Sequence, residues 1–167
     1  MQKHNDNIGS ADLQLALSND SVALKQYIDI ADNGSYEPAN RAALESAILL
    51  YREGKYEEAL KYAEKYSTRD EIIGAGALAL KGDCLVNLDR LQDAVGAYKD
   101  AISVSDRNPA YTPYFIMKLV RVYHEQGNFA EEAKMLEEIQ TEYPLYGQQH
   151  NLDIQKLLDR ARLMAAK

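Results

Sequence analysis

The residue types that most often carry out chemistry are sparse in this sequence. Its histidines and its single cysteine are His4, His124, His150 and Cys84. The histidines lie too far apart for the spacings that bind a metal ion. Cys84 has no cationic neighbour in the sequence to stabilise a thiolate, so we interpret it as a buried, unreactive thiol. We therefore expect no metal site and no catalytic nucleophile among these side chains.

Adjacent carboxylates are the other candidates for acid–base chemistry. They occur as the pairs Glu57–Glu58, Glu131–Glu132 and Glu137–Glu138. Each pair falls on the outward face of an expected helix, where it is solvated charge rather than a catalytic dyad. The sequence also contains no glycine-rich phosphate loop, nucleophile elbow or zinc motif. We expect no enzyme activity and no cofactor.

Composition and charge restrict the partners. Of the 167 residues, 46% are hydrophobic and 27% are charged, which is enough apolar matter for a folded core. The net charge of -7 repels a phosphate backbone, so we exclude nucleic acid as a partner. No run of about 18 apolar residues occurs, so we expect this chain not to insert directly into a membrane. A protein or peptide partner remains.

Apolar residues recur at helical spacing along almost the whole chain. After residues 1–9, which we expect to be disordered, the pattern predicts one domain over 10–167. Within it we expect a degenerate hairpin over 10–37, three repeated units over 38–67, 68–105 and 113–144, and a capping helix over 148–166. Thr68 and Glu71 have the spacing of a capping box at the start of the second unit.

The three units share a turn, at Gly54, Asp89 and Gly127. A period of roughly 34 residues with one helix–turn–helix in each unit is typical of tetratricopeptide repeats. The sequence resembles that family at the following positions: Gly54, Tyr56 and Ala59 in the first unit; Gly82, Leu85, Leu91, Ala94, Tyr98 and Ala101 in the second; Tyr123, Gly127, Phe129, Leu136, Ile139 and Pro144 in the third.

The resemblance implies an all-α fold, a right-handed α-α superhelix of stacked helix–turn–helix hairpins with a C-terminal capping helix. Small residues should lie where paired helices cross, so Ala47 should meet Ala59 and Gly82 should meet Ala94. The third unit departs from the pattern, because Glu132 and Val120 replace its small residues. We expect that hairpin to be shifted or more open.

In this family the first helix of each hairpin lines a concave, protein-binding groove. The matching positions here are Arg41, Leu44, Ile48, Tyr51, Gly76, Ala79, Asp83, Val86, Tyr114, Met117, Arg121 and His124. We expect the second unit to form the floor of the groove and the first and third units its walls. The set of lysines and asparagines that holds C-terminal carboxylates in chaperone-binding members is missing, so we reject that role.

Some interpretations remain open at this level. Gly74 and Gly76 each weaken a helix by about 1 kcal/mol relative to alanine, which either close packing on the preceding hairpin or room for a ligand backbone would explain. The 12 tyrosines either fill seams between helices or line the groove. An alternative to groove binding is self-association through the convex face or the terminal helix, for example through Leu157 and Met164.

A narrower resemblance concerns the cellular location. The runs RDEIIGAGALALKGDCL, DRLQDAVGAYKDAI and GNFAEEAKMLEEIQTEYP are similar to bacterial membrane-anchored repeat proteins related to the ancillary subunit of the Sec translocon. That group often has Gly-Pro where this chain has Gly74-Ala75. The resemblance implies a periplasmic domain, anchored to the inner membrane in the full-length protein, with a role in protein export or envelope assembly; the other location we consider is the cytoplasm.

Overall fold

The computed structural model describes residues 2–167, with side chains described from residue 8 onward. These residues form the α-helices α1 (Gln2–Ala16), α2 (Asp20–Asn33), α3 (Tyr36–Arg52), α4 (Tyr56–Lys65), α5 (Glu71–Asn87), α6 (Leu91–Val104), α7 (Thr112–Glu125), α8 (Phe129–Glu142), α9 (Tyr146–Gln149) and α10 (Ile154–Ala165). No strand occurs within this range. The predicted all-α class is confirmed.

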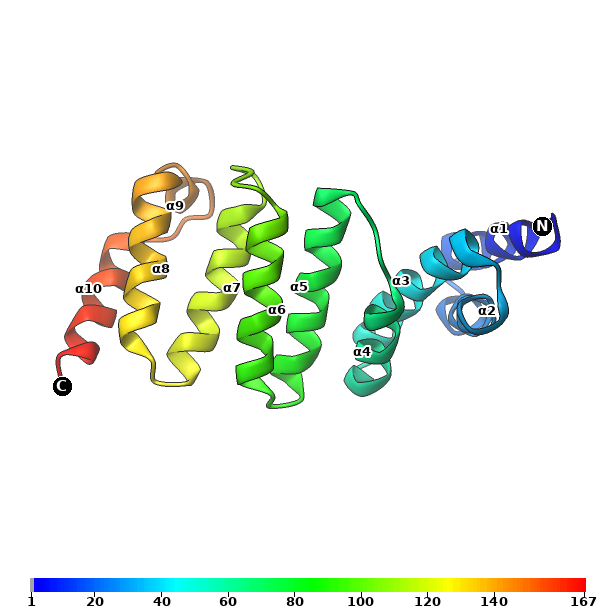
Figure 1. Ribbon diagram of the computed structural model, residues 1–167, viewed down its shortest axis with the longest axis horizontal. Coiled ribbons are helices and arrows are strands. Elements are labelled where there is room, and N and C mark those ends of the chain that lie inside the picture. Colours follow the sequence, from blue (N-terminus) through cyan, green and yellow to red (C-terminus); the bar gives the residue numbers. More distant parts are fainter. Residues whose placement is uncertain (1) are drawn as a thin grey trace.

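The helices pair into four antiparallel hairpins, α1–α2, α3–α4, α5–α6 and α7–α8, which follow one another along the long axis of the molecule (Figure 1). Helix α10 packs against α8 and closes the stack at its C-terminal end. The two chain ends therefore lie at opposite ends of the molecule. None of the helices in the described part of the chain is both long and apolar enough to cross a membrane.

All four hairpins turn through a residue with a left-handed backbone. These residues are Ser18, Gly54, Asp89 and Gly127, with φ angles of 60°, 76°, 58° and 68°. Glycine adopts this conformation without strain and aspartate tolerates it, whereas serine does so less often. The turn at Ser18 therefore gave no recognisable signal in the sequence, although it has the same geometry as the other three.

The N-terminal hairpin is more complete than we expected. We predicted disorder over 1–9, but α1 begins at Gln2; Met1 lies outside the described residues. The helix is held because Ile8 and Ala11 are buried in the main hydrophobic cluster with Ala23 and Leu24 of α2. An apolar face of this kind stabilises a helix whose sequence alone is a weak helix former.

Small residues are buried at equivalent places in the hairpins. Seven residues before each turn lie Ala11, Ala47 and Gly82, and five residues after it lie Ala23, Ala59 and Ala94, all of them buried. The packing at Gly82 also involves a side chain that we did not name. A Cβ atom there would lie 2.5 Å from the ring of Tyr98, so the missing side chain makes room for that ring.

The fourth hairpin keeps the same register despite its unusual residues. Val120 and Glu132 occupy the two crossing positions at the same separation as in the other hairpins, and both are buried. The burial of Glu132 contradicts our expectation that the pair Glu131–Glu132 lies on an outward, solvated face. The reason is that the carboxylate of Glu132 accepts hydrogen bonds from His124 of α7 at 2.9 Å and from Arg160 of α10 at 3.4 Å, which compensate its burial.

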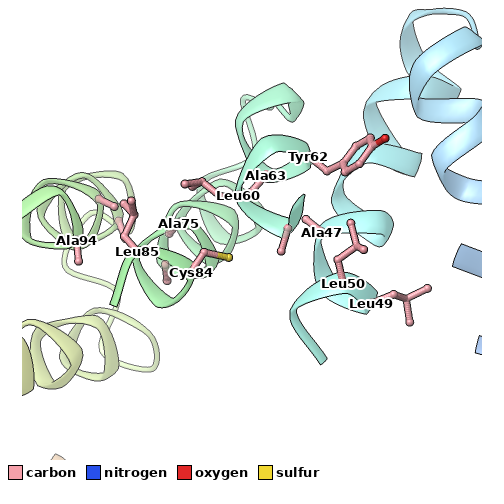
Figure 2. Packing of buried hydrophobic residues seen from close by; sticks show 14 of the residues in the cluster. Ala47, Leu49, Leu50, Leu60, Tyr62, Ala63, Ala75, Cys84, Leu85 and Ala94 are labelled. Carbon is pink, nitrogen blue, oxygen red and sulfur yellow. The ribbon is translucent and has the colours of Figure 1, made fainter. Parts of the chain in front are cut away.

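Cys84 lies in the core between neighbouring hairpins. Figure 2 shows its sulfur directed towards the hairpin α3–α4, among Leu60, Ala47 and other buried residues. Burial, with the nearby Asp83 charge, raises the pKa of the thiol to about 12. The prediction of a buried thiol is confirmed, and its high pKa keeps it protonated at neutral pH.

Two helix starts differ from the sequence-based expectation. Helix α5 is capped by Asp70, whose carboxylate accepts from the amide of Ile73 at 2.7 Å, so the predicted capping box at Thr68 does not form. The expected terminal helix is divided into the short α9 and α10, because Asp153 caps α10 by accepting from the amide of Lys156 at 2.9 Å.

Candidate protein-binding groove

The first helices of three successive hairpins, α3, α5 and α7, meet at one pocket. Four of the predicted groove residues line it: Tyr51, Asp83, Val86 and Arg121. The sequence analysis missed the other lining residues, which are Asn87, Tyr98, Lys118, Val122 and Glu125. The pocket has a volume of about 270 Å³. Residues of α3, α5 and α7 thus come together at this pocket.

The remaining predicted groove residues lie outside this pocket. Ala79 and Met117 are buried, so their side chains offer little surface to a partner. Leu44 is half-buried, whereas the following are exposed: Arg41, Ile48, Gly76, Tyr114 and His124. His4 lies outside the residues whose side chains are described.

Asp83 is held within the chain. Its carboxylate accepts from the hydroxyl of Tyr98 at 2.6 Å and from Nζ of Lys118 at 2.7 and 2.9 Å. These bonds join α5 to its hairpin partner α6 and to α7 of the next hairpin. The ammonium group of Lys118 also lies 5.0 Å from the ring centre of Tyr114, within the range of a cation–π contact.

The protonation states of this network are fixed by its surroundings. Burial, together with the hydrogen bond to Asp83, raises the pKa of Tyr98, so its hydroxyl keeps the proton that it donates. For Lys118, burial lowers the pKa, but the hydrogen bond to Asp83 and the attraction of its charge together raise the pKa further than burial lowers it. The hydroxyl of Tyr98 is therefore neutral and Lys118 is an ammonium at physiological pH.

The N-terminal hairpin contains an equivalent network. The hydroxyl of Tyr27 donates to Asp12 at 2.5 Å, and Nη2 of Arg41 lies 2.9 Å from both carboxylate oxygens of Asp12. The tyrosine follows the aspartate by 15 residues in both networks, counting from Asp12 and from Asp83. This repeated spacing is visible in the sequence and could have identified the two aspartates as structural.

The same place, six residues before the turn, carries different side chains in the other two hairpins. In α3 it is Ile48, which is 37% exposed, and in α7 it is Arg121, which is exposed. Among the side chains that the structure describes, none forms an ion pair or hydrogen bond with Arg121. Its charge acts on Tyr146: burial raises the pKa of that hydroxyl, and Arg121 partly opposes the rise.

The two glycines of α5 have different surroundings. A Cβ atom on Gly74 would lie 3.3 Å from Cγ2 of Thr68 and 3.6 Å from Cγ1 of Val104, so this glycine allows close packing. A Cβ atom on Gly76 would have no neighbour within 4 Å. The packing interpretation therefore fits Gly74, against the α4–α5 connection and α6, and does not fit Gly76, which is exposed.

The chemistry that the pocket offers follows from its side chains. Within the described residues, no cluster of three or more histidine, cysteine, aspartate or glutamate side chains could hold a metal ion. The pocket combines an aromatic ring at Tyr51, an aliphatic side chain at Val86 and the charged groups of Arg121 and Glu125. Such a mixture suits the binding of a polypeptide segment.

Comparison with known proteins gives the fold class. No family model matches the chain, and no curated protein sequence is similar to it. Two crystal structures of MamA are similar in three dimensions: one has a TM-score of 0.72 and 18% identity and covers 99% of this chain and 90% of its own, and the other has a TM-score of 0.68 and 17% identity over 93% and 94%.

A crystal structure of nearly identical TPR-like repeats, designated a kinesin light chain of Podosopora anserina, is also similar, with a TM-score of 0.64 and 13% identity over 98% of this chain and 95% of its own. The chain therefore has the fold of tetratricopeptide-repeat proteins. At these identities the comparisons define the fold.

Proposed function

We propose that this chain is a non-catalytic scaffold that binds a peptide or protein segment in its concave groove. The observation that carries the proposal is the pocket where α3, α5 and α7 meet, because it presents Tyr51, Val86 and Arg121 together on one face. Three rigid helices hold these side chains, so a segment laid across them meets a preformed surface.

The first helices already satisfy most of their own charges. Asp83 binds Lys118, and Asp12 binds Arg41, so a partner need not break these pairs to enter. What remains exposed at the pocket and beside it is apolar and aromatic at Ile48 and Tyr114, and charged at Arg121 and Glu125. A short polypeptide with apolar side chains would bury the apolar part of this surface, and polar groups of the same segment would meet the two charges.

The proposal is tested by filling the mouth of the pocket. Linear peptides selected from a random displayed library against the whole chain should bind wild type and lose roughly ten-fold or more in affinity for Glu125→Trp, because the indole occupies the space at the pocket wall. Glu57→Trp, on the exposed face of the second helix α4, is the matched control and should bind as wild type. Equal affinity for the two variants would contradict groove binding.

Self-association is the second candidate, and the N-terminal end of the stack favours it. Leu13 is 57% exposed, whereas the equivalent Leu49, Cys84 and Val122 are 3%, 0% and 2% exposed because a preceding hairpin covers them. The terminal-helix residue Leu157, which we named for this role, instead packs half-buried against the cluster of α8. A second copy covering Leu13 would therefore use the N-terminal end.

Sedimentation measures this candidate directly. Wild type should form a concentration-dependent dimer that Leu13→Glu abolishes, while Leu145→Glu, an equally exposed leucine elsewhere, leaves it intact. Monomers at every concentration would remove self-association from consideration.

The proposed function also includes a cellular location. From the sequence resemblance alone, we propose that the domain works in the periplasm, anchored to the inner membrane in the full-length protein, in protein export or envelope assembly. Fractionation of cells that express the full-length gene would test this, and recovery only in the cytoplasmic fraction would contradict it.

A further inference from the structure

The contact between the hairpins α3–α4 and α5–α6, which we call the central seam, contains small side chains. The residues twelve, eight and five places before the turn share one face of a first helix, the face towards the preceding hairpin. In α7, at the next seam, they are the buried residues Phe115, Leu119 and Val122. In α5 they are Ala77, Lys81 and Cys84. The central seam therefore buries less apolar surface from this face than the next seam does.

A hollow lies at the central seam. It has a volume of about 190 Å³ and is lined by residues of both hairpins, among them Tyr66 of α4 with Ala77 and Lys81 of α5. At the next seam, Phe115 and Leu119 stand in the places of Ala77 and Lys81. Because the surface that lines the hollow stays accessible to water, it contributes less to holding the two hairpins together.

The polar contacts across the central seam are long and exposed. Among the described side chains, Asn87 donates to the hydroxyl of Tyr51 at 3.3 Å, and Lys81 pairs with Glu64 at 3.4 Å. The side chains of Lys81 and Glu64 are 36% and 52% exposed, and an exposed ion pair contributes little to stability. The two neighbouring seams are held by the aspartate networks of α1 and α5, whose ion pairs are 2.9 Å or shorter.

The connection across the central seam has no helical structure. It covers residues 66–70, and Figure 1 shows it as an extended segment between α4 and α5. Asn40 of α3 holds the main chain of Ser67 by two hydrogen bonds of 2.8 Å, so the beginning of the connection stays with the first two hairpins. Rotations at the few residues that follow are sufficient to change the angle between hairpins.

We propose that the stack opens reversibly at the central seam, with residues 68–70 as the hinge between a unit of α1–α4 and a unit of α5–α10. Tyr51 belongs to the first unit, whereas Val86 and Arg121 belong to the second. Asp83 and Lys118 join α5 to α7 within that second unit. Opening the seam therefore moves Tyr51 away from the other residues of the pocket. This regulation of the pocket rests on the proposed function, whereas the opening of the seam does not.

The first test uses Cys84 as a reporter. It is the one cysteine of the chain and is 0% exposed at the central seam, so iodoacetamide reaches it only when the seam opens. The control combines Cys84→Ala with Val122→Cys, which places a thiol at the equivalent position of the next seam. Relative to the rate of each chain in denaturant, Cys84 should react roughly ten-fold or more faster than the control. Its rate should change little in dilute urea, since a local opening exposes less surface than unfolding.

The second test fills the hollow. Ala77→Phe supplies the residue that α7 has at the equivalent position and should slow the reaction of Cys84 roughly ten-fold, because opening must then expose more apolar surface. Ala77→Leu repeats the test with a smaller side chain. Gly96→Phe is the matched control: it adds the same ring at an exposed place on α6, where a Cβ atom would meet nothing within 4 Å, and should leave the rate unchanged. Unchanged or faster reaction in both Ala77 variants would overturn the proposal.

A third measurement separates this inference from the proposed function. A selected peptide that loses affinity for Glu125→Trp should slow the reaction of Cys84 roughly ten-fold at saturation, because it binds the chain with the seam closed. A rate unchanged by this peptide would overturn the regulation of the pocket. Equal rates at the two seams, or a Cys84 rate with the urea dependence of global unfolding, would overturn the opening and leave groove binding intact. A selection that enriches no such peptide would overturn groove binding, while faster reaction at Cys84 would still support the opening.

Discussion

In the hairpins α1–α2 and α5–α6, the residue six places before the turn is an aspartate, Asp12 or Asp83, that binds a tyrosine of its own hairpin and a basic residue of the next. In the hairpins α3–α4 and α7–α8, the same place holds Ile48 and Arg121, which have no such bonds among the described side chains. The position that holds Tyr27 and Tyr98 in the first pair of hairpins is occupied in this pair by the apolar residues Ala63 and Leu136.

The residue six places before the turn therefore has one of two roles: it either links successive hairpins or remains exposed. The aspartates tie the hairpins α1–α2 and α5–α6 each to the next hairpin, whereas Ile48 and Arg121 remain exposed. A groove position of a helical repeat therefore cannot be assigned to ligand binding from its register alone. The account can be tested by asking which of the four side chains supports stability and which supports affinity.

The largest effect on stability is expected at Asp83. Asp83→Ala removes the acceptor of Tyr98 and Lys118, and Lys118 and Asp83 have side chains that are only 18% and 21% exposed. Loss of a mostly buried partner should lower the free energy of unfolding by about 2–3 kcal/mol, measured by urea denaturation. Arg121→Ala should change it by less than about 0.5 kcal/mol. Similar losses in the free energy of unfolding for Asp83→Ala and Arg121→Ala would contradict the distinction between the two roles.

A second effect concerns the tyrosine of the same network. Gly82→Ala places a methyl group 2.5 Å from the ring of Tyr98 and should destabilise by about 1–3 kcal/mol through overpacking, although alanine favours helix. Gly76→Ala, in the same helix, should stabilise slightly. Thermal unfolding of the pair measures this difference, and a stabilised Gly82→Ala would mean that the ring of Tyr98 is not held where the network places it.

A smaller effect is expected in the N-terminal network. Asp12 and Arg41 have side chains that are 38% and 53% exposed, so water screens the pair more than in the α5 network. Asp12→Ala should lower the free energy of unfolding by about 1 kcal/mol, mainly through the lost bond to Tyr27. If Asp12→Ala lowered the free energy of unfolding as much as Asp83→Ala does, solvent exposure would not determine how much each network stabilises the fold.

The smallest effect is a dependence on alkaline pH at another tyrosine–aspartate contact, which joins α2 to α4. Burial, with the hydrogen bond to Asp32, raises the pKa of Tyr62 from 10.0 to about 12. Because the folded chain holds this proton more tightly, the contribution is fully present below pH 10 and is lost as the pH rises towards 12. Unfolding curves at about pH 8 and about pH 10.5 should show a loss in wild type that is smaller in Tyr62→Phe.

The fold was predictable where local signals repeat. Gly54, Asp89 and Gly127 mark turns by residue type, and the small residues between them place the helix crossings. The N-terminal hairpin was underestimated because Ser18 makes the same turn without a typical turn residue. Glu132 was expected on an outward face because the sequence does not show that His124 and Arg160 reach it from two other helices.

The candidate site was predictable only in outline. Register places Tyr51, Val86 and Arg121 on the concave face, and the structure brings them to one pocket. Register does not show that Ala79 and Met117 turn into the core, or that Asp83 is occupied by Lys118 from another hairpin. These outcomes depend on how successive hairpins rotate against each other, which is a property of the packed stack.

The most direct test of the two roles is the affinity of one groove-selected peptide for alanine variants at the equivalent position of different hairpins. Arg121→Ala and Ile48→Ala should weaken binding by roughly three-fold or more, because both side chains face the partner. Asp12→Ala should bind as wild type, since its carboxylate serves only the stack. Equal weakening by Asp12→Ala and Arg121→Ala would contradict the account.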